Sequence, residues 1–232
     1  MSDPKKPPDA PVRRKRSGKE LTKRYILFVI SLFVTALGVA LTRRAGLGVP
    51  PNSSISNVLS LHFLSIEIGT FIMLYNFVLL ALQIILLRKR FDPIQLIQIP
   101  VSFAFGYFTN WCVMLVSPVP VPGYPVQMVL TIAGIIVLAL GISMGVIADV
   151  VLNSAEGLVK ALSDLSGISF GTIKIIFDIV QVCIAVILSL ILFDMRIVGV
   201  REGTIIAAIL TGLIVKFFMK TIKRPVEGLL EK

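Results

Sequence analysis

Residues 126–148 read VQMVLTIAGIIVLALGISMGVIA, a run of 23 residues without a single Asp, Glu, Lys or Arg. As a helix rising about 1.5 Å per residue, such a run crosses the roughly 30 Å hydrocarbon core of a bilayer. Five further largely apolar stretches lie at residues 24–43, 68–87, 94–116, 170–193 and 203–220. Together they predict an all-α integral membrane protein with six transmembrane helices, because helices satisfy all their backbone hydrogen bonds internally.

The charge of the chain lies outside these stretches. Nine of the 23 Lys and Arg residues fall in the first 24 residues, in a Pro-rich segment with few apolar side chains. Such a segment cannot bury a core, so we expect residues 1–22 to form a disordered basic tail. The formal net charge of +10 is therefore no sign of nucleic-acid binding, and the 56% hydrophobic content excludes an ordinary soluble domain.

The distribution of basic residues predicts the orientation of the chain. With a cytoplasmic N-terminus, 18 Lys and Arg residues fall on the cytoplasmic side and four outside, so the positive-inside rule places both termini in the cytoplasm. Four prolines between positions 118 and 125 end the third helix, which makes residues 118–125 an external linker. Residues 223–232 are expected to form a cytoplasmic tail.

The two halves of the chain match each other at a fixed separation. Matched positions are 102 or 103 residues apart: Gly38 with Gly141, Gly69-Thr70 with Gly171-Thr172, and Phe91-Asp92 with Phe193-Asp194. We interpret residues 23–117 and 126–222 as two repeats of three spans each. Because three is odd, the second repeat must insert upside down, which is the inverted-repeat architecture of many secondary transporters.

Two segments are too short to cross a bilayer but carry apolar residues at helical spacing. Residues 53–65 and 154–166 are each predicted to form a short amphipathic helix, either lying at the interface or re-entrant. Asn153 and Glu156 fit the N-cap and third-position acid of a capping box at the start of the second helix, with Asn52 or Ser53 in the equivalent place of the first.

The loop after the first span reads Gly46-Leu-Gly-Val-Pro-Pro51 and precedes a Ser- and Asn-rich short helix. It resembles the Gly-Leu-Gly-x-x-Pro element of the YczE/YyaS/YitT group of bacterial membrane proteins, and Gly-Thr steps at Gly69-Thr70 and Gly203-Thr204 extend the similarity over about residues 25–220. Pro51-Asn52 stands where that group commonly has Trp-Asp after the proline. The resemblance implies a multi-pass protein of the bacterial cytoplasmic (inner) membrane.

Polar residues within or beside the spans mark the candidate site, because an ionisable group in the bilayer core costs about 2.5–3.5 kcal/mol. Lys174 and Asp178 lie one helical turn apart, so they form either a self-neutralising structural pair or part of a substrate or coupling-ion site. The candidate substrate-binding residues are Asn52, Ser53, Asn57, Asn76, Asn153, Glu156, Lys174 and Asp178. Arg43 and Arg44, after the first span, are interfacial anchors or anion contacts.

No nucleotide-binding, hydrolase or metal-binding motif occurs in the sequence, and His62, Cys112 and Cys183 lack neighbours at metal-ligand spacing. We therefore expect no catalytic residue, cofactor or metal. The architecture favours a secondary transporter (permease) of a small metabolite. If the short helices are re-entrant, their N-termini could bind an anionic group, so the metabolite could be an anion. The alternative is a non-transporting membrane anchor or regulatory partner protein. Expected partners are the lipid bilayer and a small-molecule substrate, and the chain could form a homo-oligomer.

Overall fold

The computed structural model describes residues 17–230. Among these residues, six helices are long and apolar enough to cross a membrane: α1 (Gly18–Ala45), α3 (Ile68–Leu87), α4 (Gln98–Val116), α5 (Tyr124–Ala148), α7 (Phe170–Leu192) and α8 (Glu202–Leu230). Two short helices, α2 (Pro51–His62) and α6 (Ser154–Ser166), and two 3-10 turns, η1 (Arg88–Arg90) and η2 (Pro93–Ile97), complete the described part, which contains no strand. The protein is therefore an all-α, multi-pass membrane protein.

Several predicted boundaries differ from the structure. The short helix expected at residues 53–65 is α2, which begins at Pro51 and ends at His62. Residues 18–22, expected in the disordered tail, belong to α1, while residues 1–16 lie outside the described residues. The expected C-terminal tail continues α8 to Leu230, where that side chain is buried and Lys23 donates a hydrogen bond to the carbonyl of Leu229 at 3.4 Å. The linker expected at residues 118–125 ends before Tyr124, because Pro125 occupies the first turn of α5, where a missing N–H costs little.

The contact between α1 and α5 obeys the sequence repeat. A Cβ atom at Gly38 would lie 2.5 Å from the backbone nitrogen of Leu138, and one at Gly141 would lie 2.5 Å from the backbone nitrogen of Thr35. Thr35 and Leu138 are themselves 103 residues apart, as the two glycines are. The same relation holds one turn further along each helix, where Gly134 meets Thr42 and Gly145 meets Ser31. Antiparallel helices with exchanged partners define a pseudo-two-fold axis through their crossing, as an inverted repeat requires.

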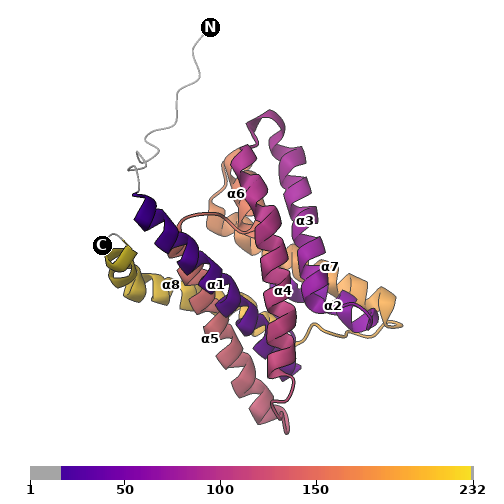
Figure 1. Cartoon of the computed structure of the whole chain (residues 1–232). Helices are drawn as coiled ribbons and strands as arrows, with labels where there is room; N and C mark the ends of the chain where they lie inside the picture. Colours follow the sequence, from indigo (N-terminus) through magenta and orange to yellow (C-terminus); the bar gives the residue numbers. More distant parts are fainter. Residues whose placement is uncertain (1–16, 231–232) are drawn as a thin grey trace.

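The other interfaces repeat across this axis (Figure 1). α1 packs on α4 as α5 packs on α8, and the short helix of each half packs on a span of the other half, α2 on α7 and α6 on α3. α2 is enclosed by these neighbours, since even its polar residues Ser53, Ser54, Ser56 and Asn57 are buried. The short helices thus link the two halves within the bundle.

One interface breaks the symmetry. α3 and α4 pack so closely that a Cβ at Gly69 would lie 2.0 Å from the carbonyl oxygen of Gly106, and Asn110 Oδ1 accepts a hydrogen bond from the Gly69 N–H at 2.6 Å. α7 and α8 have no comparable interface among residues 17–230 and run to opposite sides of the molecule in Figure 1. At Gly171, the counterpart of Gly69, a Cβ would meet no described atom within 4 Å.

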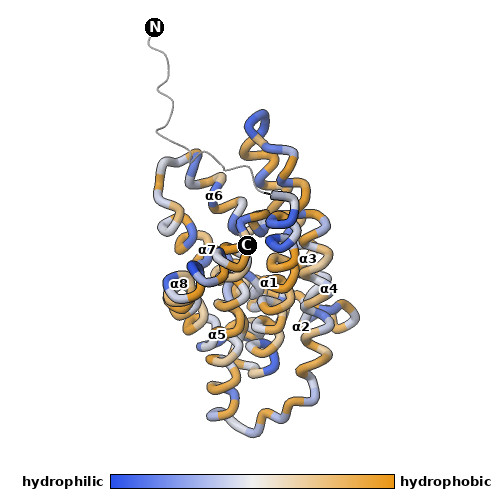
Figure 2. The backbone as a smooth tube through the Cα atoms, turned by 60° about the vertical axis from the view of Figure 1, so that its left-hand side comes forward, coloured by the Kyte–Doolittle hydropathy of each residue, from blue (hydrophilic) through white to orange (hydrophobic). Residues whose placement is uncertain are grey.

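The two ends of the bundle differ in packing. The N-terminal face, where α1 begins and α3 connects to α4, also holds the end of α8, as the Lys23–Leu229 hydrogen bond shows. At the opposite face, the Gly203 N–H donates to the carbonyl of Leu47 at 2.8 Å and Asn57 Nδ2 donates to the carbonyl of Gly199 at 2.9 Å, joining the halves. Figure 2 shows hydrophilic segments at the α3–α4 connection and along α6, against largely hydrophobic spans.

Candidate functional site

A cavity of about 610 Å³ lies at the N-terminal face. Its walls are the first half of α1, the end of α3, the start of α4, the end of α5 and α6. Both halves of the repeat therefore contribute to it. Its volume lies within the range of about 300–1,000 Å³ that is usual for small-molecule sites.

Two buried glutamines form the most unusual part of the lining. Gln83 of α3 and Gln98 of α4 are each 1% exposed, and the side-chain oxygen of each has no hydrogen-bond partner in the described part of the chain. Their amide nitrogens lie over Gly157 of α6, where a Cβ would be 2.5 Å from Gln83 Nε2 and 3.0 Å from Gln98 Nε2. Buried polar atoms nearly always find a partner, so these oxygens call for one that comes from outside the chain.

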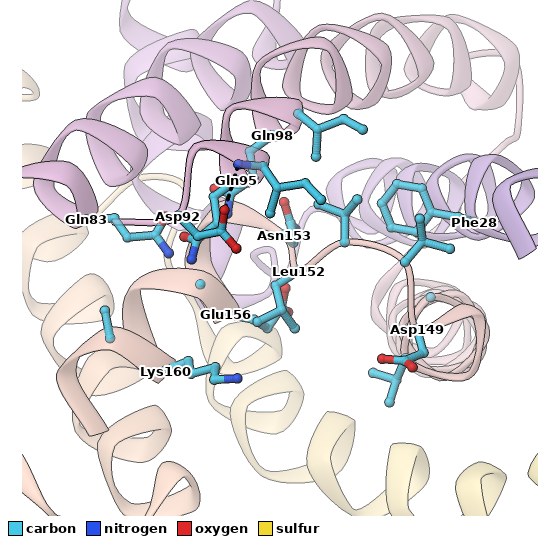
Figure 3. A pocket seen from close by; sticks show the side chains of 18 of the residues that line it. Phe28, Gln83, Asp92, Gln95, Gln98, Asp149, Leu152, Asn153, Glu156 and Lys160 are labelled. Atoms are coloured by element: carbon cyan, nitrogen blue, oxygen red, sulfur yellow. Dashed lines mark hydrogen bonds between the residues drawn. The ribbon is translucent and has the colours of Figure 1, made fainter. Parts of the chain in front are cut away.

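The start of α6 brings two predicted residues to the cavity. Asn153 Oδ1 accepts a hydrogen bond from the Ser154 N–H at 3.0 Å, and the backbone N–H groups of Glu156 and Asn153 favour the charged form of the Glu156 carboxyl, which offsets part of the larger effect of burial on its pKa. The predicted N-cap of α6 and the acid in its first turn are thus confirmed. The equivalent prediction for the first short helix is wrong, because α2 begins at Pro51 and Asn52 and Ser53 lie inside its first turn, where neither side chain caps the helix. The side chains of Asn153 and Glu156 also line the cavity, where Figure 3 shows them near Gln83 and Gln98.

Burial dominates the electrostatics of Glu156. It raises the pKa of the carboxyl above its usual range, and the Lys174 ammonium opposes that shift only in part. Lys174 Nζ is itself hydrogen-bonded to Asp178 Oδ1, so the two residues form the self-neutralising pair that the spacing allowed. Neither of them lines the cavity, but both act on Glu156 through their charge.

Replacing Glu156 with glutamine is expected to flatten the pH dependence of stability. Because the folded state holds the Glu156 proton more tightly than the unfolded chain, this residue's contribution is complete below its ordinary pKa of about 4.3 and is lost as the pH rises through the raised value. The unfolding temperature of the wild type should therefore fall from pH 5 to pH 8 more than that of Glu156→Gln. Thermal unfolding in detergent measures both. Asp164→Asn, an exposed acid of the same cavity, should keep the wild-type profile, and equal profiles for wild type and Glu156→Gln would contradict the expectation.

The remaining predicted residues lie away from this cavity. Asn52, Ser53, Asn57 and Asn76 are not among the described residues that line it. The side chain of Asn57 holds the α7–α8 connection, while Asn76 is buried in α3 with an amide nitrogen that has no partner among residues 17–230. The structure therefore divides the predicted substrate-binding set into three groups. Asn153 and Glu156 line the cavity, Lys174 and Asp178 form a pair on α7, and the other four residues lie on α2 and α3.

The two arginines after the first span hold the chain together. Arg43 Nη1 donates to Ser60 Oγ at 2.7 Å, and Arg44 donates twice to the carbonyl of Val119, at 2.9 and 2.6 Å. Neither is a lining residue of the cavity in the described chain. These hydrogen bonds give both arginines a structural role within the protein.

Sequence reasoning missed the glutamines and Gly157. The available signal was a glutamine inside an apolar span, since Gln83 lies within the predicted span 68–87 and Gln98 within 94–116. The charged residues at the cavity mouth gave no such signal, because they lie in connections and on the exposed turns of α6. They are Arg90, Asp92, Asp149, Lys160 and Asp164.

Comparison with known protein families shows one match that covers most of the chain. A family of unknown function, DUF6198, matches residues 22–220, which include all six long helices in whole or in large part. The chain belongs to the DUF6198 family. All the residues that line the cavity lie within the matched region. Neither a curated protein nor a solved structure matches the chain.

Proposed function

We propose that the protein is a secondary transporter (permease) of a small metabolite that works by alternating access. The observation that carries the proposal is the unequal packing of the two halves. α3 and α4 are in close contact at Gly69 and Gly106. The corresponding helices α7 and α8 do not pack together in the described chain, and a Cβ at Gly171 would meet no atom within 4 Å there. Inverted repeats allow the halves to exchange conformations, which moves an opening from one face to the other.

The exchanged state follows from the repeat. Carrying the 102-residue offset along the chain pairs Gly106 with Ala208, which is exposed on α8. In that state α7 would close on α8 at Gly171 and Ala208, and α3 would part from α4. The cavity at the N-terminal face would then close and an equivalent one would open at the opposite face.

The opposite face holds the contacts that this exchange would break. They are the hydrogen bonds from the Gly203 N–H to Leu47 and from Asn57 to Gly199, both of which join one half to the other. A small number of hydrogen bonds is suited to a gate, because each contributes only about 0.5–1.5 kcal/mol net. The predicted residue Asn57 would accordingly serve the gate.

The orientation and localisation complete the proposal. With both termini cytoplasmic, the N-terminal face is the cytoplasmic face and the described conformation is open to the cytoplasm. The Gly46–Pro51 loop supports a relation to the YczE/YyaS/YitT group and hence a bacterial cytoplasmic membrane. A protein of this kind needs no catalytic residue, cofactor or metal, and its partners are the bilayer and the transported molecule.

A cysteine pair tests whether the exchanged state exists. We expect Gly171→Cys/Ala208→Cys, made in a chain with Cys112→Ala and Cys183→Ala, to form an intramolecular disulfide when membranes are oxidised. Cysteine Cα atoms must approach to about 4.4–6.8 Å for this bond, which the described conformation does not allow at an open Gly171. The fraction of cross-linked chains is measured by blocking free thiols with a polyethylene glycol maleimide and reading the gel shift.

The control pair is Gly171→Cys/Leu213→Cys. Leu213 corresponds to Trp111, whose ring packs on Phe33 of α1, so this side of α8 is not expected to meet α7 in either state. Cross-linking of the Ala208 pair and not the Leu213 pair supports the transporter. Absence of the disulfide in the Ala208 pair would favour the non-transporting anchor or regulatory protein, which needs only one conformation.

A further inference from the structure

We propose that the cavity binds its ligand through a protonated amino group, with Gln83 Oε1, Gln98 Oε1 and the Glu156 carboxylate as the acceptors. This inference names the substrate class of the proposed transporter and rests on that function. It also departs from the expectation of an anionic substrate, which the helix N-termini suggested and which no contact to Arg43 or Arg44 supports in the described cavity.

The unsatisfied oxygens carry the argument. Gln83 and Gln98 come from different helices, each is 99% buried, and each presents an acceptor without a partner among residues 17–230. Leaving such an oxygen unpaired is unfavourable, and the side-chain oxygen of the partly buried lining residue Gln95 is also without a partner in the described chain. Two such oxygens on fully buried side chains of one cavity indicate that donors arrive from outside. A third acceptor, Glu156, comes from α6, next to the glycine on which both amides rest.

The geometry suits an ammonium group. Both side chains end beside Gly157, since their amide nitrogens lie within 3.0 Å of a single Cβ position there. Each unpartnered oxygen is bonded to the same carbon as one of these nitrogens, so the two oxygens belong to amide groups that end at the same place. Gln83 comes from α3, Gln98 from α4 and Glu156 from α6, and Figure 3 shows their labels around the same part of the cavity. An ammonium group has three N–H donors and no acceptor, which matches three acceptors from three directions.

The charges of the lining point the same way. The ionisable lining residues, apart from Tyr25, are four acids and two bases: Asp92, Asp149, Glu156 and Asp164 against Arg90 and Lys160. The neighbouring Lys174 is already paired with Asp178 and adds no net charge. A cavity lined by an excess of carboxylates concentrates cations at its mouth.

Four probes with one four-carbon chain separate charge from hydrogen bonding. They are butylammonium, butyramide, butyrate and butyltrimethylammonium, each added to the detergent-purified full chain while thermal unfolding is followed. At ten times its dissociation constant, butylammonium is expected to raise the unfolding temperature by about 2–6 °C, because it binds only the folded state. Butyramide should give a smaller rise, and butyrate and butyltrimethylammonium none.

Three variants assign the effect to the site. Gln83→Leu and Gln98→Leu should abolish the butylammonium shift without lowering the unfolding temperature of the free protein, since each removes an unpaired buried oxygen. Gly157→Ala should reduce the shift, because its Cβ displaces both amides. Gln181→Leu is the matched control: Gln181 is equally buried and unpaired within the described chain but lies outside the cavity lining, so its variant should keep the shift.

The outcomes distinguish this inference from the proposed function. A butyrate or butyltrimethylammonium shift as large as that of butylammonium, or a full shift in Gln83→Leu and Gln98→Leu, would overturn the ammonium site. A butylammonium shift in a protein whose Gly171→Cys/Ala208→Cys pair never cross-links would leave the site standing and remove the transport function. Cross-linking of that pair without any butylammonium shift would support the transport function and overturn the ammonium site.

Discussion

Alanine at Gly38 or at Gly141 is expected to lower the unfolding temperature by roughly 3–10 °C. Each new Cβ would lie 2.5 Å from a backbone nitrogen of the facing helix, so the helices themselves must move apart. Overpacking of this kind costs about 1–3 kcal/mol, and 1 kcal/mol corresponds to about 2–4 °C in a chain of this size. Thermal unfolding of the purified variants in one detergent measures the effect.

The pseudo-two-fold axis makes this prediction sharper. Because Gly38 meets Leu138 as Gly141 meets Thr35, the two alanine variants should lose similar stability. Gly212→Ala, on α8, is the control, since its Cβ would meet no atom within 4 Å in the described chain and alanine favours the helix. A large loss at only one of the two glycines would show that the halves are not equivalent at this crossing.

Removing Lys174 should have the other large effect on stability. Lys174→Met leaves Asp178 without its ion-pair partner. It also removes the positive charge that partly offsets the effect of burial on the pKa of Glu156. Breaking a fully buried ion pair costs about 3–5 kcal/mol. The two side chains here keep 30% and 21% exposure, so we expect about 2–3 kcal/mol, or a fall of several degrees in the unfolding temperature.

A double substitution separates the pair from its surroundings. Lys174→Met/Asp178→Asn removes both charges and should regain most of the stability lost by Lys174→Met alone, because no uncompensated carboxylate remains on α7. Thermal unfolding of the wild type, the two single variants and the double variant completes the cycle. If Lys174→Met is as stable as the wild type, the pair has no structural role and its charges are retained for another purpose.

Much of the fold is predictable from local properties of the sequence. The span at residues 68–87 and the short helix at residues 154–166 were predicted with the bounds that the structure shows, since apolar length and capping residues act within a single helix. The repeat was visible because Gly38 and Gly141 occupy equal positions in each half. The helix ends at residues 18 and 230 were missed, because contacts between the two termini stabilise them.

The candidate site was only partly predictable. Asn153 and Glu156 were found through their capping pattern, which is a local signal. Arg24, the first residue of the predicted span 24–43, was counted only among the cytoplasmic basic residues. It is 5% exposed and donates to the carbonyls of Ile147 and Ala148 at the end of α5. A contact across 123 residues has no signature in a single sequence.

The sequence by itself determined the membrane environment, the number of spans and the inverted repeat, because each depends on the length, polarity or order of segments along the chain. Only the tertiary structure decided which polar residues share a cavity and which half is closed. Gln83, Gln98 and Gly157 lie on three helices, and their meeting depends on how those helices cross. The same holds for Gly69 and Gly171, which are alike in the sequence and differ only in whether a neighbouring helix packs against them.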